Sequence, residues 1–153
     1  MARGPGAGEQ GFTLIEMMMV VAIVAILIGI AIPTFLSTRP RAQDSVAESE
    51  ARQALKAERI LFTDKQAFSD NPADAHSVEP AFAYTNSPPP AAGSNQVYLK
   101  AYGTPATTLV VGTRSASGIC FWMRDRPTGP GTEYLANDCR ATPDDASPMG
   151  PSW

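Results

Sequence analysis

The longest apolar run of the chain lies near its N-terminus, where residues 17–32 are sixteen consecutive positions without a polar side chain. As a helix, residues 12–33 would extend roughly 33 Å, which matches the hydrocarbon core of a bilayer. One carboxylate, Glu16, lies just inside the start of this segment. A charge inside a membrane segment costs about 2.5–3.5 kcal/mol and usually marks a functional position. The alternative is a plain single-pass anchor in which Glu16 reaches back to the lipid headgroups.

A second helical pattern follows at residues 41–64. Its apolar positions recur at three- and four-residue spacing, which predicts an amphipathic helix with one buried face; these positions are Ala47, Ala51, Ala54, Leu55, Leu61 and Phe62. Pro40 lies between the two patterns, and because proline disfavours helix in the residue before it, we expect a kink or an interruption near residues 37–39.

Three later segments, residues 97–102, 107–113 and 118–124, are short, rich in β-branched and aromatic residues, and separated by turn-forming residues. They predict antiparallel strands, with a short edge pairing at Tyr134 and Leu135. Residues 66–96 contain several proline and glycine turn signals and are expected to form a connecting region. The predicted fold class is α+β, because the amphipathic helix face is the available partner for one face of a small antiparallel sheet.

The composition limits the kinds of binding and catalysis that we expect of this chain. The formal net charge of −3 leaves no overall basic character of the kind that nucleic-acid binding requires. His76 is the only histidine, so neither a zinc site of the usual kind nor a serine–histidine triad is expected, and we interpret it as a loop residue. With no phosphate-binding glycine loop and no nucleophile–base arrangement, the sequence predicts no catalytic residues, no cofactor and no metal, and disfavours an enzyme.

Residues 11–36, GFTLIEMMMVVAIVAILIGIAIPTFL, resemble the N-terminus of type IV pilins and of the related secretion pseudopilins. The resemblance implies that a prepilin peptidase cuts after Gly11 and that the new amino group of Phe12 is N-methylated. It also implies assembly into a helical filament, in which the Glu16 carboxylate pairs with the Phe12 amine of a neighbouring subunit. A buried acid without such a partner would be driven towards its neutral form.

The resemblance divides the chain into a cleaved leader at residues 1–11, a transmembrane and filament-core helix at 12–36, an amphipathic helix half at 37–65 and a globular head at 66–153. Gly29 and Pro33 weaken the first helix. They mark either a harmless kink or a stretch near residues 25–33 that unwinds during assembly. Pilins place the leader in the cytoplasm, whereas Arg39 and Arg41 after the span favour the opposite orientation.

Cys120 and Cys139 are the only cysteines, and an even count in an exported domain indicates a disulfide. The loop that they would close, residues 124–138, is expected to contain little regular structure. This arrangement resembles the disulfide-bounded C-terminal region of many pilins. The tail acids Asp138, Asp144 and Asp145 resemble the calcium loop of some pseudopilins, but we expect them to be solvated surface groups.

The sequence therefore predicts a structural subunit of a type IV pilus. Its expected partners are copies of itself, a prepilin peptidase with N-methyltransferase activity, the pilus assembly machinery and the membrane. The precursor is expected in the cytoplasmic membrane and the mature subunit in an extracellular filament. Alternatives are a pseudopilin of a type II secretion system, a minor or DNA-uptake pilin, and a monomeric membrane-anchored domain.

Overall fold

The computed structural model describes residues 11–153, so all of the predicted leader at residues 1–11 except Gly11 lies outside the described part of the chain. Two helices and five strands follow one another along the chain: α1 (Leu14–Lys65), α2 (Pro72–Val78), β1 (Ala83–Thr85), β2 (Gln96–Gly103), β3 (Ala106–Arg114), β4 (Cys120–Arg126) and β5 (Gly131–Asn137). Contacts divide the chain into two compact units, with the boundary between Thr38 and Arg39.

Helix α1 runs as one element of 52 residues through Gly29, Pro33 and Pro40. The predicted interruption near residues 37–39 is therefore wrong. A proline inside a helix removes one amide donor and costs about 3 kcal/mol, but this penalty is local. Helix-forming residues continue on both sides, and the Thr38 hydroxyl donates a hydrogen bond of 2.9 Å to the Phe35 carbonyl in the same stretch of the helix.

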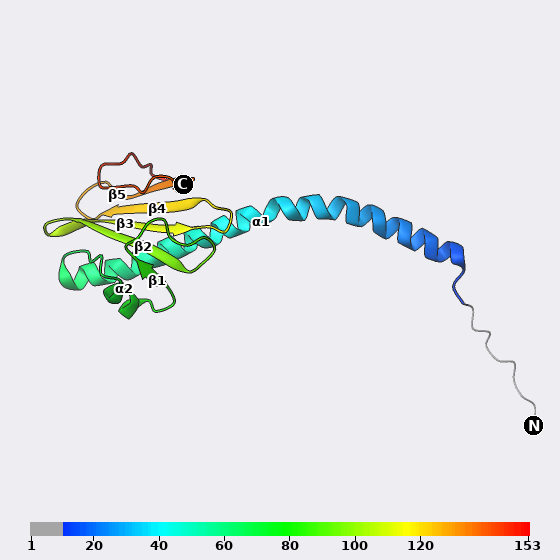
Figure 1. Ribbon diagram of the computed structural model, residues 1–153, viewed down its shortest axis with the longest axis horizontal. Helices are drawn as coiled ribbons and strands as arrows, with labels where there is room; N and C mark the ends of the chain where they lie inside the picture. The colour runs from blue at the N-terminus through cyan, green and yellow to red at the C-terminus, as the bar shows by residue number, and fades with distance from the viewer. Residues whose placement is uncertain (1–10) are drawn as a thin grey trace, which may run out of the picture. The chain divides into compact units, whose positions relative to one another are not determined.

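The second unit contains one five-stranded sheet in the order β1-β2-β3-β4-β5 (Figure 1). Strands β2 to β5 pair in antiparallel fashion, which confirms the predicted antiparallel sheet. Two parts of the sheet were not expected. Strand β1 pairs with β2 in parallel. Strand β5 contains the edge pairing predicted at Tyr134 and Leu135, but it pairs with β4 along its whole length, so the stretch predicted to contain little regular structure is largely a β-hairpin.

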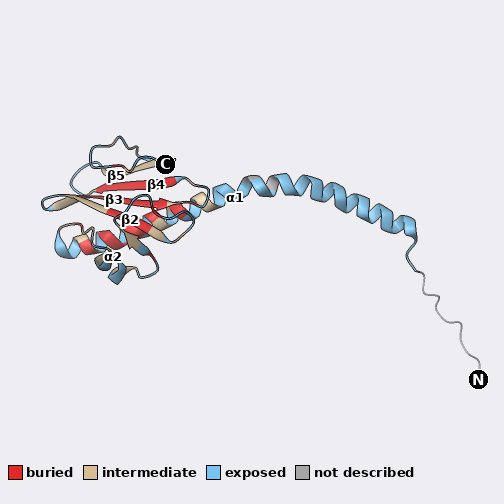
Figure 2. Ribbon diagram, in the orientation of Figure 1, coloured by how far each residue is buried: buried red, intermediate tan, exposed pale blue. Residues whose placement is uncertain are grey.

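The C-terminal part of α1 packs against one face of this sheet. Small residues of the predicted stripe are fully buried there, together with apolar side chains from β2, β3 and β4; the members include Ala51, Ala54, Leu55, Val97, Leu99, Leu109, Val111 and Met123. Figure 2 shows the buried positions concentrated in the central strands and in this part of the helix. Alanines allow the helix backbone to approach the sheet closely, so the apolar stripe positions the helix on it.

A charged contact also joins α1 to the sheet. The Arg59 guanidinium donates two hydrogen bonds to the Asp125 carboxylate, at 2.9 and 2.6 Å, and a third to the Thr132 hydroxyl at 2.7 Å. The Asp125 side chain is 1% exposed, and these hydrogen bonds raise the pKa of Arg59. Removing Arg59 would leave the buried Asp125 charge without its ion-pair partner, which is destabilising.

The C-terminal tail is fastened to the outer face of the sheet by Arg124. One guanidinium nitrogen donates to the carbonyls of Asp144, Asp145 and Ser147, and the Arg124 Nε pairs with Glu133 at 2.9 Å. The hydrogen bond from Arg124 holds the pKa of the Glu133 carboxyl below its ordinary value. Gly150 then pairs with the edge strand β5, so the tail covers an edge that would otherwise be open to pairing with another chain.

Gly112 on β3 lies directly beneath the ring of Trp122. A Cβ added at Gly112 would approach the Trp122 ring to 2.2 Å, and Trp122 is fully buried. We therefore expect Gly112→Ala to lower the free energy of unfolding by about 1–3 kcal/mol or more through overpacking. Urea unfolding followed by tryptophan fluorescence measures this change. Gly150→Ala is the control, because its Cβ would meet its nearest atom at an ordinary 3.7 Å. Equal stability of the two variants would contradict this packing argument.

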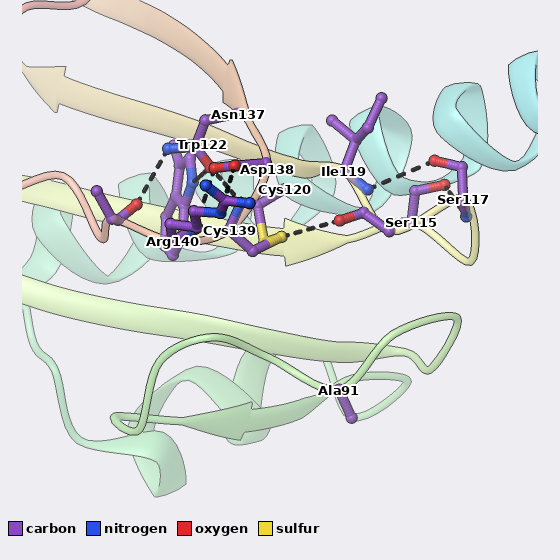
Figure 3. The surroundings of a disulfide bond; sticks show 12 residues. Ala91, Ser115, Ser117, Ile119, Cys120, Trp122, Asn137, Asp138, Cys139 and Arg140 are labelled. Carbon is purple, nitrogen blue, oxygen red and sulfur yellow. Dashed lines mark hydrogen bonds and ion pairs between the residues drawn. A yellow bond between two sulfur atoms is a disulfide. The ribbon is translucent and has the colours of Figure 1, made fainter.

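The Cys120–Cys139 disulfide is present, with a Cα–Cα distance of 5.1 Å, and it joins the beginning of β4 to the residues just after β5. Figure 3 shows Trp122 and Asn137 beside it, and the Trp122 indole donates a hydrogen bond of 3.0 Å to the Asn137 amide oxygen. The bond thus closes the open end of the β4–β5 hairpin.

Replacing both cysteines with serine is expected to lower the free energy of unfolding by about 2–5 kcal/mol, because the unfolded chain gains freedom when this loop is opened. Denaturant unfolding followed by circular dichroism measures the loss. The parent protein with its disulfide reduced is the control, and it should lose a similar amount. If the double-serine variant and the reduced parent were both as stable as the oxidised parent, the disulfide would have no stabilising role.

Candidate functional site

The N-terminal end of α1 is built around Thr13 and Glu16. One Glu16 oxygen, Oε2, accepts hydrogen bonds from the Thr13 backbone amide and from the Thr13 hydroxyl, both at 2.8 Å. The Thr13 hydroxyl in turn accepts from the Glu16 backbone amide at 3.3 Å. This reciprocal arrangement is a capping box, which satisfies amide donors that the first turn of a helix leaves free. The capping role of Thr13 was not predicted from the sequence, although the T-x-x-E spacing of Thr13 and Glu16 is typical of a capping box.

The capping box changes the interpretation of Glu16. In the free subunit this carboxylate already serves its own helix, and its negative charge at the helix N-terminus is also favourable to the helix dipole. Within the described residues 11–153, the other carboxylate oxygen of Glu16 accepts no hydrogen bond. Glu16 can therefore keep its capping contacts and still offer one oxygen to a cation from outside the chain.

Gly11 and Phe12 precede the helix and are exposed. The Phe12 side chain is 79% exposed, and a Cβ added at Gly11 would have no atom within 4 Å. The fold of this chain therefore gives no steric reason for a glycine at position 11 or for an aromatic residue at position 12. A requirement for either residue would have to come from another molecule.

The apolar part of α1 is exposed on all sides: every residue from 14 to 33 is exposed, and Figure 2 draws this stretch in pale blue. Its large exposed residues include Leu14, Ile15, Met18, Val21, Ile26, Leu27, Ile30, Phe35 and Leu36. In length and composition, α1 is the one helix among the described residues that is able to cross a membrane. Such an apolar surface requires a covering of lipid or protein, because contiguous exposed apolar patches of this extent are rare in soluble monomers.

Gly29 and Pro33 lie farther along the same helix. The helix is continuous at both positions, and a Cβ added at Gly29 would have no neighbour within 4 Å. The intrachain packing therefore does not require this glycine. Its predicted role in unwinding during assembly concerns a different state of the chain and stays a prediction.

The tail acids each have a local partner. Asp138 pairs with Arg140 and Asp145 with Arg126, while Asp144 accepts hydrogen bonds from Ser147 and Ala146, which lower its pKa. No group of three or more metal-ligating side chains occurs in the described part of the chain. His76, which the sequence placed in a loop, lies instead in α2, with its Nδ1 3.3 Å from the Phe82 carbonyl oxygen.

Comparisons with known proteins agree with this geometry. The Prokaryotic N-terminal methylation motif matches residues 7–32. The chain is 43% identical over 62 residues to the type IV major pilin protein PilA of Myxococcus xanthus, and 39% identical over 64 residues to the type IV wide pilus major component PilA4 of Thermus thermophilus. These alignments cover 40% and 42% of this chain, and the chain spans only 28% and 49% of the two relatives.

A third relative extends the similarity over almost the whole chain. The fimbrial protein EcpC of Eikenella corrodens is 32% identical over 146 residues, and the alignment covers 88% of this chain and 94% of that protein. An alignment of this extent includes most of the N-terminal helix and most of the sheet. Taken with the methylation motif at the start of α1, it shows that the chain belongs to the type IV pilin family.

Proposed function

We propose that this chain is a structural subunit of a type IV pilus, cut after Gly11 by a prepilin peptidase and assembled through its N-terminal helix. The observation that carries this proposal is the helix itself. It displays apolar side chains on every side, and a carboxylate with one oxygen that accepts no hydrogen bond within residues 11–153 lies beside the position that would become the new N-terminus. A plain anchor would need the apolar surface but not the carboxylate.

Cleavage after Gly11 would place a positively charged amine on Phe12, one residue from Thr13. In the filament core, this amine would pair with the Glu16 carboxylate of a neighbouring subunit. Methylation would keep the amine cationic, so the pair would survive that modification. The helices would then cover one another's apolar surfaces, replacing the lipid that covers them before assembly.

The relatives also support a pilus subunit. Two of them are named as major components of type IV pili, and the third as a fimbrial protein. In this account the precursor lies in the cytoplasmic membrane with its leader inside. The mature subunit then leaves the membrane with the help of the pilus assembly machinery and becomes part of a filament outside the cell.

The test is expression in a host that supplies a prepilin peptidase and a complete pilus assembly machinery. Shearing of the cells should release filaments that contain this chain, and intact-mass analysis should show that it begins at Phe12. The matched control is the same host without the peptidase, in which the full-length chain should stay in the membrane fraction. A processed chain that never enters the sheared fraction would support a monomeric anchored domain instead.

A further inference from the structure

A carboxylate with no partner is buried inside the second unit. Glu58, on the C-terminal part of α1, is fully buried, and neither of its oxygens has a hydrogen-bond partner among residues 11–153. The hydroxyl of Tyr84 on β1 is also buried without a partner in the same part of the chain. Burial is the main cause that raises the pKa of Tyr84, and the charges of Glu79 and Glu58 add to the rise, so Glu58 and Tyr84 interact. Two unsatisfied polar groups in one interior are unusual in a native fold.

Among the described residues, the charged groups around Glu58 form no ion pair with it. Lys65, on the same helix, bonds to Asp74 of α2 at 2.9 Å, and Lys100 of β2 bonds to Asp70 at 2.8 Å. Both lysines are therefore already paired, and the two aspartates repel a negative charge on Glu58. Glu79, at the end of α2, adds a further negative charge near Tyr84.

Burial is the main cause that raises the pKa of Glu58, to about 7. The Ser69 backbone amide lies close enough to lower the pKa of Glu58, although it makes no hydrogen bond of ordinary geometry to it. Asp74 and Asp70 add to the rise, and the Lys65 charge opposes it. Below neutral pH the side chain is thus mostly protonated, and a neutral carboxyl is far less costly to keep in a dry interior than a carboxylate.

Outside α1, the groups that act on Glu58 are Ser69, Asp70 and Asp74, and Tyr84 interacts with it as well. All four belong to the segment 69–85, which we call the cover segment. It contains α2 and β1, and it is attached to the core by the buried side chains of Ala75 and Phe82. Its attachment is modest, since α2 has only seven residues and β1 only three. Segments with few buried contacts are those that open locally before the rest of a domain.

We propose that Glu58 is a pH-sensitive latch for the cover segment. With Glu58 protonated, the cover segment packs over it and the domain is closed. When Glu58 ionises, the unpaired charge favours hydration, and the cover segment opens locally while the sheet stays folded. This device goes beyond the role of the N-terminal helix in assembly and does not depend on it.

The direction of the pH dependence follows from the pKa of Glu58 in the open and closed states. In the open state its pKa returns towards 4.5, whereas in the closed state it is about 7. The closed state therefore holds more protons between these values, so closure is most stable below pH 4.5 and weakens as the pH rises through 7. Above pH 7 the effect levels off, because Glu58 is then ionised in both states.

Hydrogen exchange of the full chain in detergent micelles tests the proposal. After correction for the intrinsic pH dependence of exchange, the protection of amides in the cover segment should fall at least about tenfold from pH 5 to pH 8, because each unit of pKa difference is a factor of ten in the equilibrium. Protection in β3 and β4 should not change. Glu58→Gln should remove the pH dependence, because the amide does not ionise.

Glu48→Gln is the matched control, since Glu48 lies on the same helix but pairs with Arg52 at the surface. It should retain the parent's pH dependence. A carboxyl carbon titration of Glu58 by NMR on the parent protein is the second measurement, with an expected midpoint near 7. The proposal is overturned by a midpoint below 5, by equal protection of the parent's cover segment at both pH values, or by an unchanged pH dependence in Glu58→Gln.

Discussion

Glu16→Leu is expected to yield a processed, membrane-inserted chain that forms few or no filaments. Removing the carboxylate relieves an insertion penalty of about 2.5–3.5 kcal/mol, so insertion itself should not suffer. In the filament, however, the Phe12 ammonium would lie in an apolar core without its counter-charge. Breaking one side of a buried pair costs about 3–5 kcal/mol, and this cost recurs at every subunit. Quantifying the chain in sheared and membrane fractions measures the effect.

The capping box supplies the controls that separate charge from helix stability. Glu16→Gln retains a side chain that caps the helix but lacks the negative charge, so it should fail to assemble as Glu16→Leu does. Thr13→Ala loses the cap, at a cost of about 0.5–2 kcal/mol, but keeps the charge and should assemble to a large extent. Glu16→Asp, which also keeps the charge, should retain some assembly.

The pattern across these variants decides between two roles of Glu16. If Glu16→Gln assembled like the parent while Thr13→Ala failed, Glu16 would act through the helix cap and the intersubunit charge pair would be wrong. If Glu16→Leu assembled as well as the parent, neither role would matter for filament formation.

Gly11→Val is expected to block processing and therefore all later steps. A Cβ at position 11 would meet no atom within 4 Å in the described part of the chain, so the substitution should not disturb the fold of residues 11–153. Any effect must then arise where the peptidase binds the segment, and a branched side chain at the cleavage position would obstruct that contact. The chain should accumulate at full length in the membrane, with no filaments, and intact-mass analysis of the membrane fraction gives the result.

Gly29→Ala is the matched control for this experiment. Its Cβ would also lie in open space, yet it is far from the cleavage position, so processing should be complete. A Gly11→Val chain that is cut to begin at Phe12 as efficiently as the Gly29→Ala chain would contradict the proposed recognition of Gly11.

The helix and three central strands were predictable because their signals are local. The alanine and leucine spacing around Ala51, Ala54 and Leu55 defined the buried helix face, and the structure buries all three. The interruption predicted from Pro40 was wrong, because a proline weakens only one turn of a helix. Helix-forming residues on both sides of that turn keep α1 continuous. For β5 the sequence predicted only a short edge pairing at Tyr134 and Leu135. The strand is longer than that, and its sequence, GTEYLAN, has few strongly apolar residues that would have indicated its full length.

The residues of the candidate site also divide into those that have a local sequence signal and those that do not. Gly11, Phe12 and Glu16 stand out in sequence because a polar, glycine-containing segment meets an apolar helix. The partners that determine the local chemistry were less visible. Thr13 was overlooked although its spacing to Glu16 is a capping signal. The isolation of Glu58 could not be read from sequence at all, since it depends on Lys65 and Lys100 being paired elsewhere in the fold.

A cryo-electron-microscopy reconstruction of filaments built from this chain tests the central claim most directly. The account predicts N-terminal helices bundled in the filament core, with a Glu16 oxygen within about 4 Å of the Phe12 amine of a neighbouring subunit, the range of an ion pair. Glu16 should keep its contact with Thr13 at the same time. A filament in which the Phe12 amine lies away from every Glu16, or in which the subunits are joined only through residues 66–153, would contradict the account.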